Sequence, residues 1–306
     1  MKINSVLIAG AGAIGLSTAE SIFSSDPLNI SILAKGERLE RYRKNGLRVN
    51  GKKIDFRFSS GEKADLIIIA CKYHNLDEII KDIAPSVGRD TIILSLLNGI
   101  TSEEIIGREL GRERLPLAMV LGTDAFHKGE ETTFTRKGVV HFGDADGRNG
   151  EREERIAEFF TRTGVPFQLE ENMKRKLWYK FMMNVGVNQT TAILKLRYRV
   201  VQKNGVAGEI PEARLIIEKS MREVIEVANA EGIDLDEKDI ENQYNTLNLL
   251  NPEGYTSMCQ DILAERKTEV EMFSLALMDL AKKHGIKVPV NEMFYLLLRT
   301  IEQVNN

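Results

Sequence analysis

Hydrophobic and polar positions divide the chain into a first half with strand patterns and a second half with helical patterns. Short, continuous apolar runs bounded by turn residues are typical of strands in a parallel sheet that is covered on both faces. The first half contains strand-like runs at Ser5 to Ala9, Asn29 to Ala34, Ala64 to Ala70, Thr91 to Leu96, Leu117 to Val120, Gly138 to Gly143 and Val165 to Phe167. A charged amphipathic helix is predicted from Glu151 to Thr161.

Two alternating runs, Gly46 to Asn50 and Ile54 to Phe58, flank the dipeptide Asn50-Gly51. This dipeptide is a strong hairpin signal, because both residues readily adopt the left-handed backbone that a two-residue turn needs. We therefore predict a strand pair that departs from the main sheet. The later segment from Asp124 to Lys137 is polar and separates two predicted strands.

From Met173 onward the pattern is helical, and strand patterns are nearly absent. Helices are predicted at Met173 to Leu194, Pro211 to Ala230, Asp236 to Leu250, Ser257 to Lys283 and Val290 to Val304. A chain of 306 residues is long for a single core, so two domains are expected. We predict an α/β Rossmann domain over residues 1–170 and an all-helical domain over residues 171–306.

The first predicted strand is followed directly by a Gly-x-Gly-x-x-Gly motif and then by a helical pattern. In this context the three glycines permit a tight turn, a close approach of the backbone to a pyrophosphate, and tight packing of helix on strand. The residues of this predicted dinucleotide loop are Gly10, Ala11, Gly12, Ala13, Ile14 and Gly15.

The residues after the second strand indicate which dinucleotide is bound. An NAD site carries an acidic residue there for the ribose hydroxyls, whereas this chain places Lys35 and Arg38 at that point, with only Glu37 arguing for NAD. The balance favours NADP. Lys72 and Asn98 follow two further strands, where ligands of open α/β sheets bind, while a loop cation and a turn asparagine remain credible alternatives.

Lys180, Asn184 and Asn188 form a polar row on an otherwise apolar helix. Each step of four residues drifts by only about 40° around an α-helix, so the three side chains share one face and are able to converge on one ligand. A solvent-exposed stripe is the alternative explanation for the row taken alone.

Composition narrows the possible functions. The formal charge of −3 offers no field for nucleic acid, and no apolar run approaches the length of a membrane span, about 18 residues. A cytoplasmic location is expected. Cys71 and Cys259 are too few for a disulfide framework and lack companions for a metal site, and we assign no chemistry to His74, His127 or His141.

The sequence resembles the ketopantoate reductase (2-dehydropantoate 2-reductase) family over essentially its whole length. The ordered motifs that carry the resemblance are Gly10 to Gly15, Lys35 to Leu39, Cys71-Lys72, Leu97-Asn98-Gly99, Leu177 to Lys180 with Asn184 and Asn188, Thr256 to Asp261, Lys267 to Val270 and His284 to Pro289. The resemblance implies NADPH-dependent reduction of a 2-oxo acid in pantothenate biosynthesis. It also implies a helical domain like the C-terminal domain of 6-phosphogluconate dehydrogenase, and a homodimer.

The same resemblance implies a role for each matching residue. Lys180 is the proton donor and Glu269 the active-site glutamate, while Lys72, Asn98, Lys35 and Arg38 lie on the cofactor side. The implied substrate ligands are Asn184, Asn188, Thr256 and Ser257. Lys35 replaces the usual arginine, which keeps the charge and loses the bidentate fork.

Three departures from the family pattern concern the substrate pocket. The chain has Glu271 where the family has an aspartate, Phe273-Ser274 where it has Asn-Gly, and Leu196 to Arg199 where a glycine-containing turn and an asparagine are common. Reduction of another 2-oxo acid is therefore an alternative. A protein that senses NADP without turnover is a second alternative, disfavoured because it would need only the first half of the chain.

Overall fold

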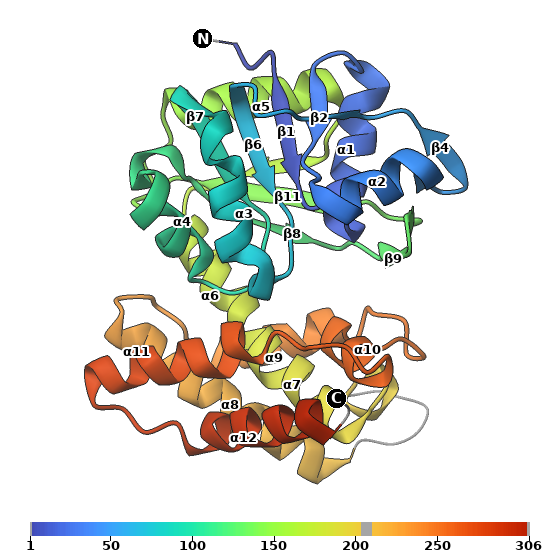
Figure 1. The fold of residues 1–306 in the computed structure, drawn as a ribbon. Coiled ribbons are helices and arrows are strands. Elements are labelled where there is room, and N and C mark those ends of the chain that lie inside the picture. The colour runs from blue at the N-terminus through green and yellow to red at the C-terminus, as the bar shows by residue number, and fades with distance from the viewer. Residues whose placement is uncertain (1, 203–209, 305–306) are drawn as a thin grey trace. The chain divides into compact units, whose positions relative to one another are not determined.

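The computed structural model describes residues 2–202 and 210–304, which divide into two compact units, 1–174 and 175–306. The first unit contains an α/β architecture and the second is helical (Figure 1). The unit boundary lies four residues after the position expected from the sequence. The α/β class followed by an all-helical part is confirmed.

A five-stranded parallel sheet forms the centre of the first unit, in the order β5-β2-β1-β6-β7. Its strands are Val6–Ala9 (β1), Ile30–Ile32 (β2), Arg57–Phe58 (β5), Ala64–Ile69 (β6) and Val87–Ser95 (β7). The side chains of β1 and of the aliphatic part of β6 are buried, as expected for strands covered on both faces.

Helices cover both faces of this sheet. They are Ala13–Ser25 (α1), Gly36–Asn45 (α2), Leu76–Ile83 (α3), Ser102–Leu110 (α4) and Glu151–Thr163 (α5). Helix α1 packs against α5, and α3 packs against α4. In Figure 1, α3 lies in front of the strands and α5 behind them, the arrangement of a doubly wound sheet.

A three-stranded sheet, β12-β11-β8, continues the first unit. It contains Leu117–Leu121 (β8), Val139–Gly143 (β11) and Phe167–Leu169 (β12). The last strand begins two residues later than predicted, because the Val140 N–H donates to the carbonyl of Pro166 and the parallel ladder continues from Phe167.

The hairpin at Asn50-Gly51 is confirmed. Strands Leu47–Val49 (β3) and Lys52–Ile54 (β4) pair with Val49 opposite Lys52, and Asn50 and Gly51 have φ values of 48° and 79°. The predicted run from Ile54 to Phe58 is wrong as one strand: Ile54 ends β4, whereas Arg57 and Phe58 leave the hairpin and pair with β2 at the edge of the parallel sheet.

The polar segment from Asp124 to Lys137 contains two strands that the sequence pattern did not reveal. Phe126–Lys128 (β9) and Glu131–Thr133 (β10) form a second hairpin, and β10 pairs in parallel with β3. The result is a four-stranded sheet in the order β4-β3-β10-β9.

The helices of the second unit follow the predicted pattern with two exceptions. They are Met173–Met183 (α6, which begins at the end of the first unit), Gln189–Leu194 (α7), Pro211–Ala230 (α8), Glu237–Leu247 (α9), Ser257–Leu263 (α10), Ala276–His284 (α11) and Pro289–Val304 (α12). Single turns of 3₁₀-helix lie at Tyr73–Asn75, Ala84–Ser86, Arg112–Arg114 and Tyr198–Val200.

The first exception is that the helix predicted from Met173 to Leu194 contains a π-helical turn, Asn184–Asn188. The second is that Ser257 to Lys283 is not one helix. Helix α10 ends at Leu263, Glu265 has φ 53°, and a second π-turn, Glu271–Leu275, precedes α11. The break is stabilised by Glu302 of α12, which accepts hydrogen bonds from the Thr268 N–H and hydroxyl (2.7 and 2.6 Å).

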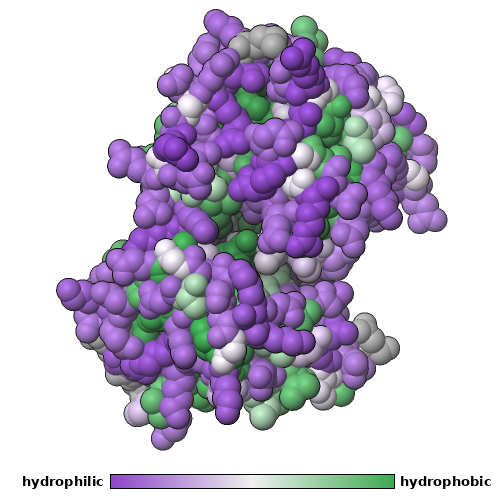
Figure 2. Space-filling model, turned by 90° about the vertical axis from the view of Figure 1, so that its left-hand side faces the viewer, coloured by the Kyte–Doolittle hydropathy of each residue, from purple (hydrophilic) through white to green (hydrophobic). Residues whose placement is uncertain are grey.

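The face of the molecule in Figure 2 is mostly hydrophilic, with hydrophobic residues in small groups. Within residues 2–202 and 210–304, no helix has the length and hydrophobicity to cross a membrane. The same residues contain no cluster of three or more His, Cys, Asp or Glu arranged to bind a metal ion.

Candidate functional site

The glycine loop between β1 and α1 shows why each glycine is needed. A Cβ on Gly10, where φ is 118°, would lie 2.6 Å from the carbonyl of Ala70, and one on Gly15 would lie 1.8 Å from the Gly10 oxygen. A Cβ on Gly12 would meet no protein atom within 4 Å. The fold therefore requires Gly10 and Gly15, whereas Gly12 keeps open space in front of the loop.

That open space lies at the start of α1, where N–H groups have no partner within the helix. Gly12 is the N-cap and provides no side-chain cap, and the first turn contains no acidic residue. These features fit an anionic group, because unpaired N–H donors and the helix dipole both attract negative charge.

His127 and Thr132 support the glycine loop from the second hairpin. The His127 Nδ1 lies 2.8 Å from the Thr132 hydroxyl, which donates to the Gly12 carbonyl oxygen at 3.4 Å. Burial lowers the pKa of His127. The sequence contained no signal for this contact, since it depends on the unpredicted pairing of β10 with β3.

The two cations predicted to recognise a 2′-phosphate have different surroundings. Lys35, the N-cap of α2, forms an ion pair with Asp82 of α3 at 2.6 Å. Arg38 is exposed on the first turn of α2, and the described residues provide no hydrogen bond or ion pair to it. Arg38 is therefore the more available of the two for an anion.

Lys72 and Asn98 follow adjacent strands of the parallel sheet. Ile69 of β6 lies between Ala9 of β1 and Ser95 of β7 in the ladder. The chain segments that follow these three parallel strands therefore all start at the carboxyl end of the sheet. Lys72 and Asn98 thus follow the carboxyl end of the sheet, which also carries the glycine loop, as the sequence predicted.

In the helical unit, Asn184 and Asn188 share one face, since the Asn188 Nδ2 donates to the Asn184 Oδ1 at 3.1 Å. The turn that connects them is the π-turn. Its i→i+5 bonds enclose more than four residues, whereas the α-turn contains 3.6. The four residues from Lys180 to Asn184 follow an α-helix and therefore complete slightly more than one full turn. The four residues from Asn184 to Asn188 pass through the π-turn and complete slightly less than one full turn. The π-turn thus offsets the drift of the row.

The Asn184 side chain has an unused donor. The residue is 8% exposed, and its Nδ2 is buried without a hydrogen-bond partner. A buried, unpaired amide donor is unfavourable by about 1–3 kcal/mol. An acceptor placed beside Asn184 and Asn188 would satisfy this donor.

Lys180, on α6, has an altered ionisation. Burial lowers its pKa to about 8, and the negative charge of Glu269 raises the pKa against this effect. Glu269 is itself 7% exposed and lies just before the second π-turn. An ammonium with a pKa near working pH is suited to give up a proton.

Thr256 and Ser257 begin α10 and differ in exposure. The Thr256 hydroxyl is buried, accepts a hydrogen bond from the Cys259 N–H (3.2 Å) and lies 2.8 Å from the Thr191 hydroxyl of α7. Thr256 thus caps α10 and connects it to α7. Ser257 is exposed at the first position of α10.

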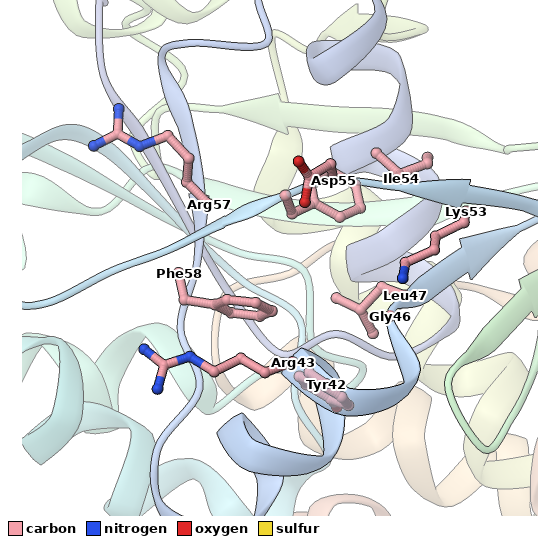
Figure 3. Close-up of a pocket in the computed structure, with 10 residues that line it drawn as sticks. Tyr42, Arg43, Gly46, Leu47, Lys53, Ile54, Asp55, Arg57 and Phe58 are labelled. Carbon is pink, nitrogen blue, oxygen red and sulfur yellow. The ribbon is translucent and has the colours of Figure 1, made fainter.

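A separate cavity of about 310 Å³ lies beside the first hairpin (Figure 3). Apolar groups, including Tyr42 and Phe58 with stacked rings, line it together with the charged side chains of Arg43, Lys53 and Asp55. None of the residues predicted to bind cofactor or substrate lines this cavity.

Two sequence models of one family match the chain. The model described as Ketopantoate reductase PanE/ApbA matches residues 6–147, and the one described as Ketopantoate reductase PanE/ApbA C terminal matches residues 172–302. The chain belongs to the ketopantoate reductase family. The two matched regions correspond to the α/β unit and the helical unit, so family membership applies to both.

Curated members of the ketopantoate reductase family resemble the chain over its full length. A 2-dehydropantoate 2-reductase from Pyrococcus horikoshii is 29% identical over 98% of this chain and 98% of its own. Another from Archaeoglobus fulgidus is 26% identical over 99% of both. These relatives support the assignment of the chain to the oxidoreductases of this family.

Solved structures share the fold. A dimeric ketopantoate reductase from Staphylococcus aureus superposes with a TM-score of 0.83 at 22% identity, covering 99% of this chain and 100% of that one. A D-mandelate dehydrogenase with NADH superposes with a TM-score of 0.86 at 23% identity, again over 99% and 100% of the two chains. A D-mandelate dehydrogenase thus shares its fold with this chain.

Proposed function

We propose that the protein reduces 2-dehydropantoate (ketopantoate) to pantoate with NADPH, a step of pantothenate biosynthesis, and that Lys180 is the proton donor. The observation that carries this proposal is the helical site. Its lysine has a pKa of about 8 beside a buried glutamate, and the same helix presents an unpaired buried amide donor at Asn184. The names of the full-length relatives support the substrate.

The α/β unit fits a nicotinamide dinucleotide, which supplies a hydride when it is bound. The open space at Gly12 and the free N–H groups of α1 suit the pyrophosphate. Arg38 and Lys35 suit the 2′-phosphate, and Lys72 and Asn98 are the proposed contacts nearer the nicotinamide. The ion pair of Lys35 with Asp82 leaves Arg38 as the main contact of the phosphate.

In the helical unit, the ketone oxygen of the substrate acquires negative charge as its carbon is reduced. The Lys180 ammonium donates a proton to this oxygen, which becomes the product hydroxyl, and the neutral amine then regains a proton from solvent. Before the transfer, the positive charge also stabilises the developing oxyanion. Glu269 keeps Lys180 protonated by raising its pKa.

The amides orient the substrate. The Asn184 Nδ2 is a hydrogen-bond donor without an acceptor, and a 2-oxo acid has carboxylate and ketone oxygens at adjacent carbons. Asn188 holds Asn184 in this orientation through its own amide, and the exposed Ser257 hydroxyl provides a further contact for the carboxylate. Thr256 acts behind it as the cap of α10.

Steady-state kinetics with ketopantoate, other 2-oxo acids and both reduced nicotinamide cofactors test this proposal through nicotinamide absorbance. We expect the highest kcat/KM for ketopantoate with NADPH. Absence of turnover with every 2-oxo acid would refute a reductase function.

A reductase of another 2-oxo acid is the second candidate. Phe273 and Ser274 occupy positions where the family has Asn-Gly, and both are buried. A structural neighbour, D-mandelate dehydrogenase, was solved with anilino(oxo)acetate and NADH. A preference for an aromatic 2-oxo acid in the same substrate series would favour this candidate.

We also propose a homodimer, formed through the outer face of α12. The buried face of this helix carries Asn291, Phe294, Leu298 and Glu302, whereas Met293 and Leu296 are 54% and 59% exposed. An apolar outer face is typical of an interface, and two-fold symmetry lets one face serve both subunits. Light scattering should give the dimer mass for the native protein and the monomer mass for Leu296→Lys.

A further inference from the structure

The two π-turns of the helical unit lie against each other, and each adjoins a part of the proposed site. Asn184–Asn188 contains both substrate amides, and Glu271–Leu275 begins two residues after Glu269. A π-turn is rare because it interrupts the regular α-helical ladder, and displaced backbone groups then need other partners. Two such turns in contact therefore require a local cause.

Gln189 provides a side-chain partner for the first π-turn. It is fully buried, and its Nε2 donates to the Val185 carbonyl oxygen inside the turn at 3.0 Å. The Gln189 Oε1 accepts a hydrogen bond from the hydroxyl of Ser274, which lies inside the second π-turn, at 2.7 Å. One side chain thus connects the two turns.

Asn291 and Glu223 hold this connection from behind. The Asn291 Oδ1 lies 3.4 Å from the Gln189 Nε2 and 3.5 Å from the Ser274 hydroxyl. The Glu223 carboxylate accepts from the Asn291 Nδ2 (2.7 Å) and from the N–H groups of Asn291 (3.0 Å) and Val290 (2.8 Å). The network therefore fixes Gln189 and Ser274 against α8 and α12.

We infer that Gln189 and Ser274 are positioning residues that hold the two π-turns in register, so that Asn184 and Asn188 face the substrate with Glu269. The inference rests on the proposed function. Without the Gln189 amide, the Val185 carbonyl oxygen loses this hydrogen bond, and the extra residue of the turn is free to move along the helix. Each residue that it passes rotates by about 100° around the helix axis.

Gln202 provides a matched control. It is also a buried glutamine of the helical unit, and its Nε2 donates to two carbonyls, those of Leu247 (2.8 Å) and Leu250 (2.9 Å). Its bonds reach neither π-turn. Gln202→Met and Gln189→Met therefore each remove a buried amide that donates to backbone carbonyl oxygen, and they differ in where that amide acts.

The test measures KM for the 2-oxo acid, kcat, the Kd of NADPH by fluorescence, and hydrogen exchange of the peptide over residues 180–194. We expect Gln189→Met and Ser274→Ala to raise KM by about 10- to 100-fold, as misplaced substrate contacts do, with an unchanged Kd of NADPH. Exchange should increase in this peptide for Gln189→Met and stay native for Gln202→Met. The double variant should show little more effect than Gln189→Met alone, since both changes break one connection.

Two outcomes would overturn the inference: native exchange over 180–194 in Gln189→Met, or equal KM values in Gln189→Met and Gln202→Met. The exchange measurement does not depend on turnover. If the native protein reduces no 2-oxo acid, the proposed function fails, while exchange still decides whether Gln189 holds the π-turn.

Discussion

The glycine loop and the lysine helix build their parts of the proposed site in different ways. At the glycine loop the proposed binding groups are backbone N–H donors, and the absence of side chains keeps the space in front of them open. On the lysine helix the proposed binding groups are side chains, and two of them, Asn184 and Asn188, lie on a π-turn. In a site built from backbone groups, substitution of a glycine directly disturbs the binding groups. In a site built from side chains, the orientation of the binding groups depends on the residues that pack around them.

Removal of the lysine side chain is expected to have the largest effect. Lys180→Ala should lower kcat by about 10²- to 10⁴-fold, because it removes both the proton donor and the charge beside the oxyanion. Stopped-flow or steady-state rates with NADPH measure the effect. The Kd of NADPH should stay native, since the proposed cofactor contacts belong to the α/β unit.

Lys174→Ala is the control for this change, because Lys174 lies on the same helix and is exposed. It should leave kcat native. A Lys180→Ala enzyme with nearly native turnover would remove Lys180 from the mechanism.

The glycine loop was predictable because its requirement is local. Strand, glycine turn and helix follow one another within about twenty residues, and the backbone angles that they need restrict the sequence directly. The same holds for the hairpin at Asn50-Gly51, where two left-handed residues form the whole turn. The structure of such elements can therefore be predicted from their own residues.

The lysine helix was only half predictable. The i, i+4 spacing correctly placed Asn184 and Asn188 on one face, but the same spacing fits an ordinary α-helix, so the π-turn was invisible. Gln189, which directly follows the turn, is hydrogen-bonded to Ser274, 85 residues away along the chain. The break after Leu263 likewise depends on Glu302, 34 residues from Thr268. Tertiary hydrogen bonds of this kind leave no local pattern.

The second prediction compares two glycines of one loop. Gly12→Ala should weaken NADPH binding by about tenfold or more while the melting temperature stays native, since the added methyl group meets no protein atom and enters the space assigned to the pyrophosphate. Gly15→Ala should instead lower stability by about 1–3 kcal/mol, because its Cβ would overlap the Gly10 carbonyl. Fluorescence titration and thermal unfolding separate the two effects.

Equal losses of affinity and stability in both variants would contradict the division of roles within the loop. An unchanged Kd in Gly12→Ala would place the pyrophosphate elsewhere.

The third prediction concerns the choice between NADPH and NADH. Arg38→Ala should reduce the preference for NADPH by about tenfold, the effect of one charged contact to a phosphate. Lys35→Ala should reduce it less, because Lys35 is already paired with Asp82. Asp82→Asn should increase it, because Lys35 then loses its competing partner. The ratio of kcat/KM values for the two cofactors measures each change, and a larger effect of Lys35→Ala than of Arg38→Ala would reverse the assignment.

The smallest expected effect is a change in pH dependence at the lysine helix. Burial lowers the pKa of Lys180 to about 8, so the protonated fraction, and with it kcat, should fall as the pH rises through 8. Glu269 raises this pKa, and Glu269→Gln removes that negative charge while keeping a similar shape. The fall in kcat should therefore begin at lower pH in Glu269→Gln. Glu265→Gln changes an exposed carboxylate of the preceding turn and should leave the profile native. A fall that stays near pH 8 in Glu269→Gln would mean that another group limits the rate, and the side-chain site would then lack the electrostatic coupling that distinguishes it from the glycine loop.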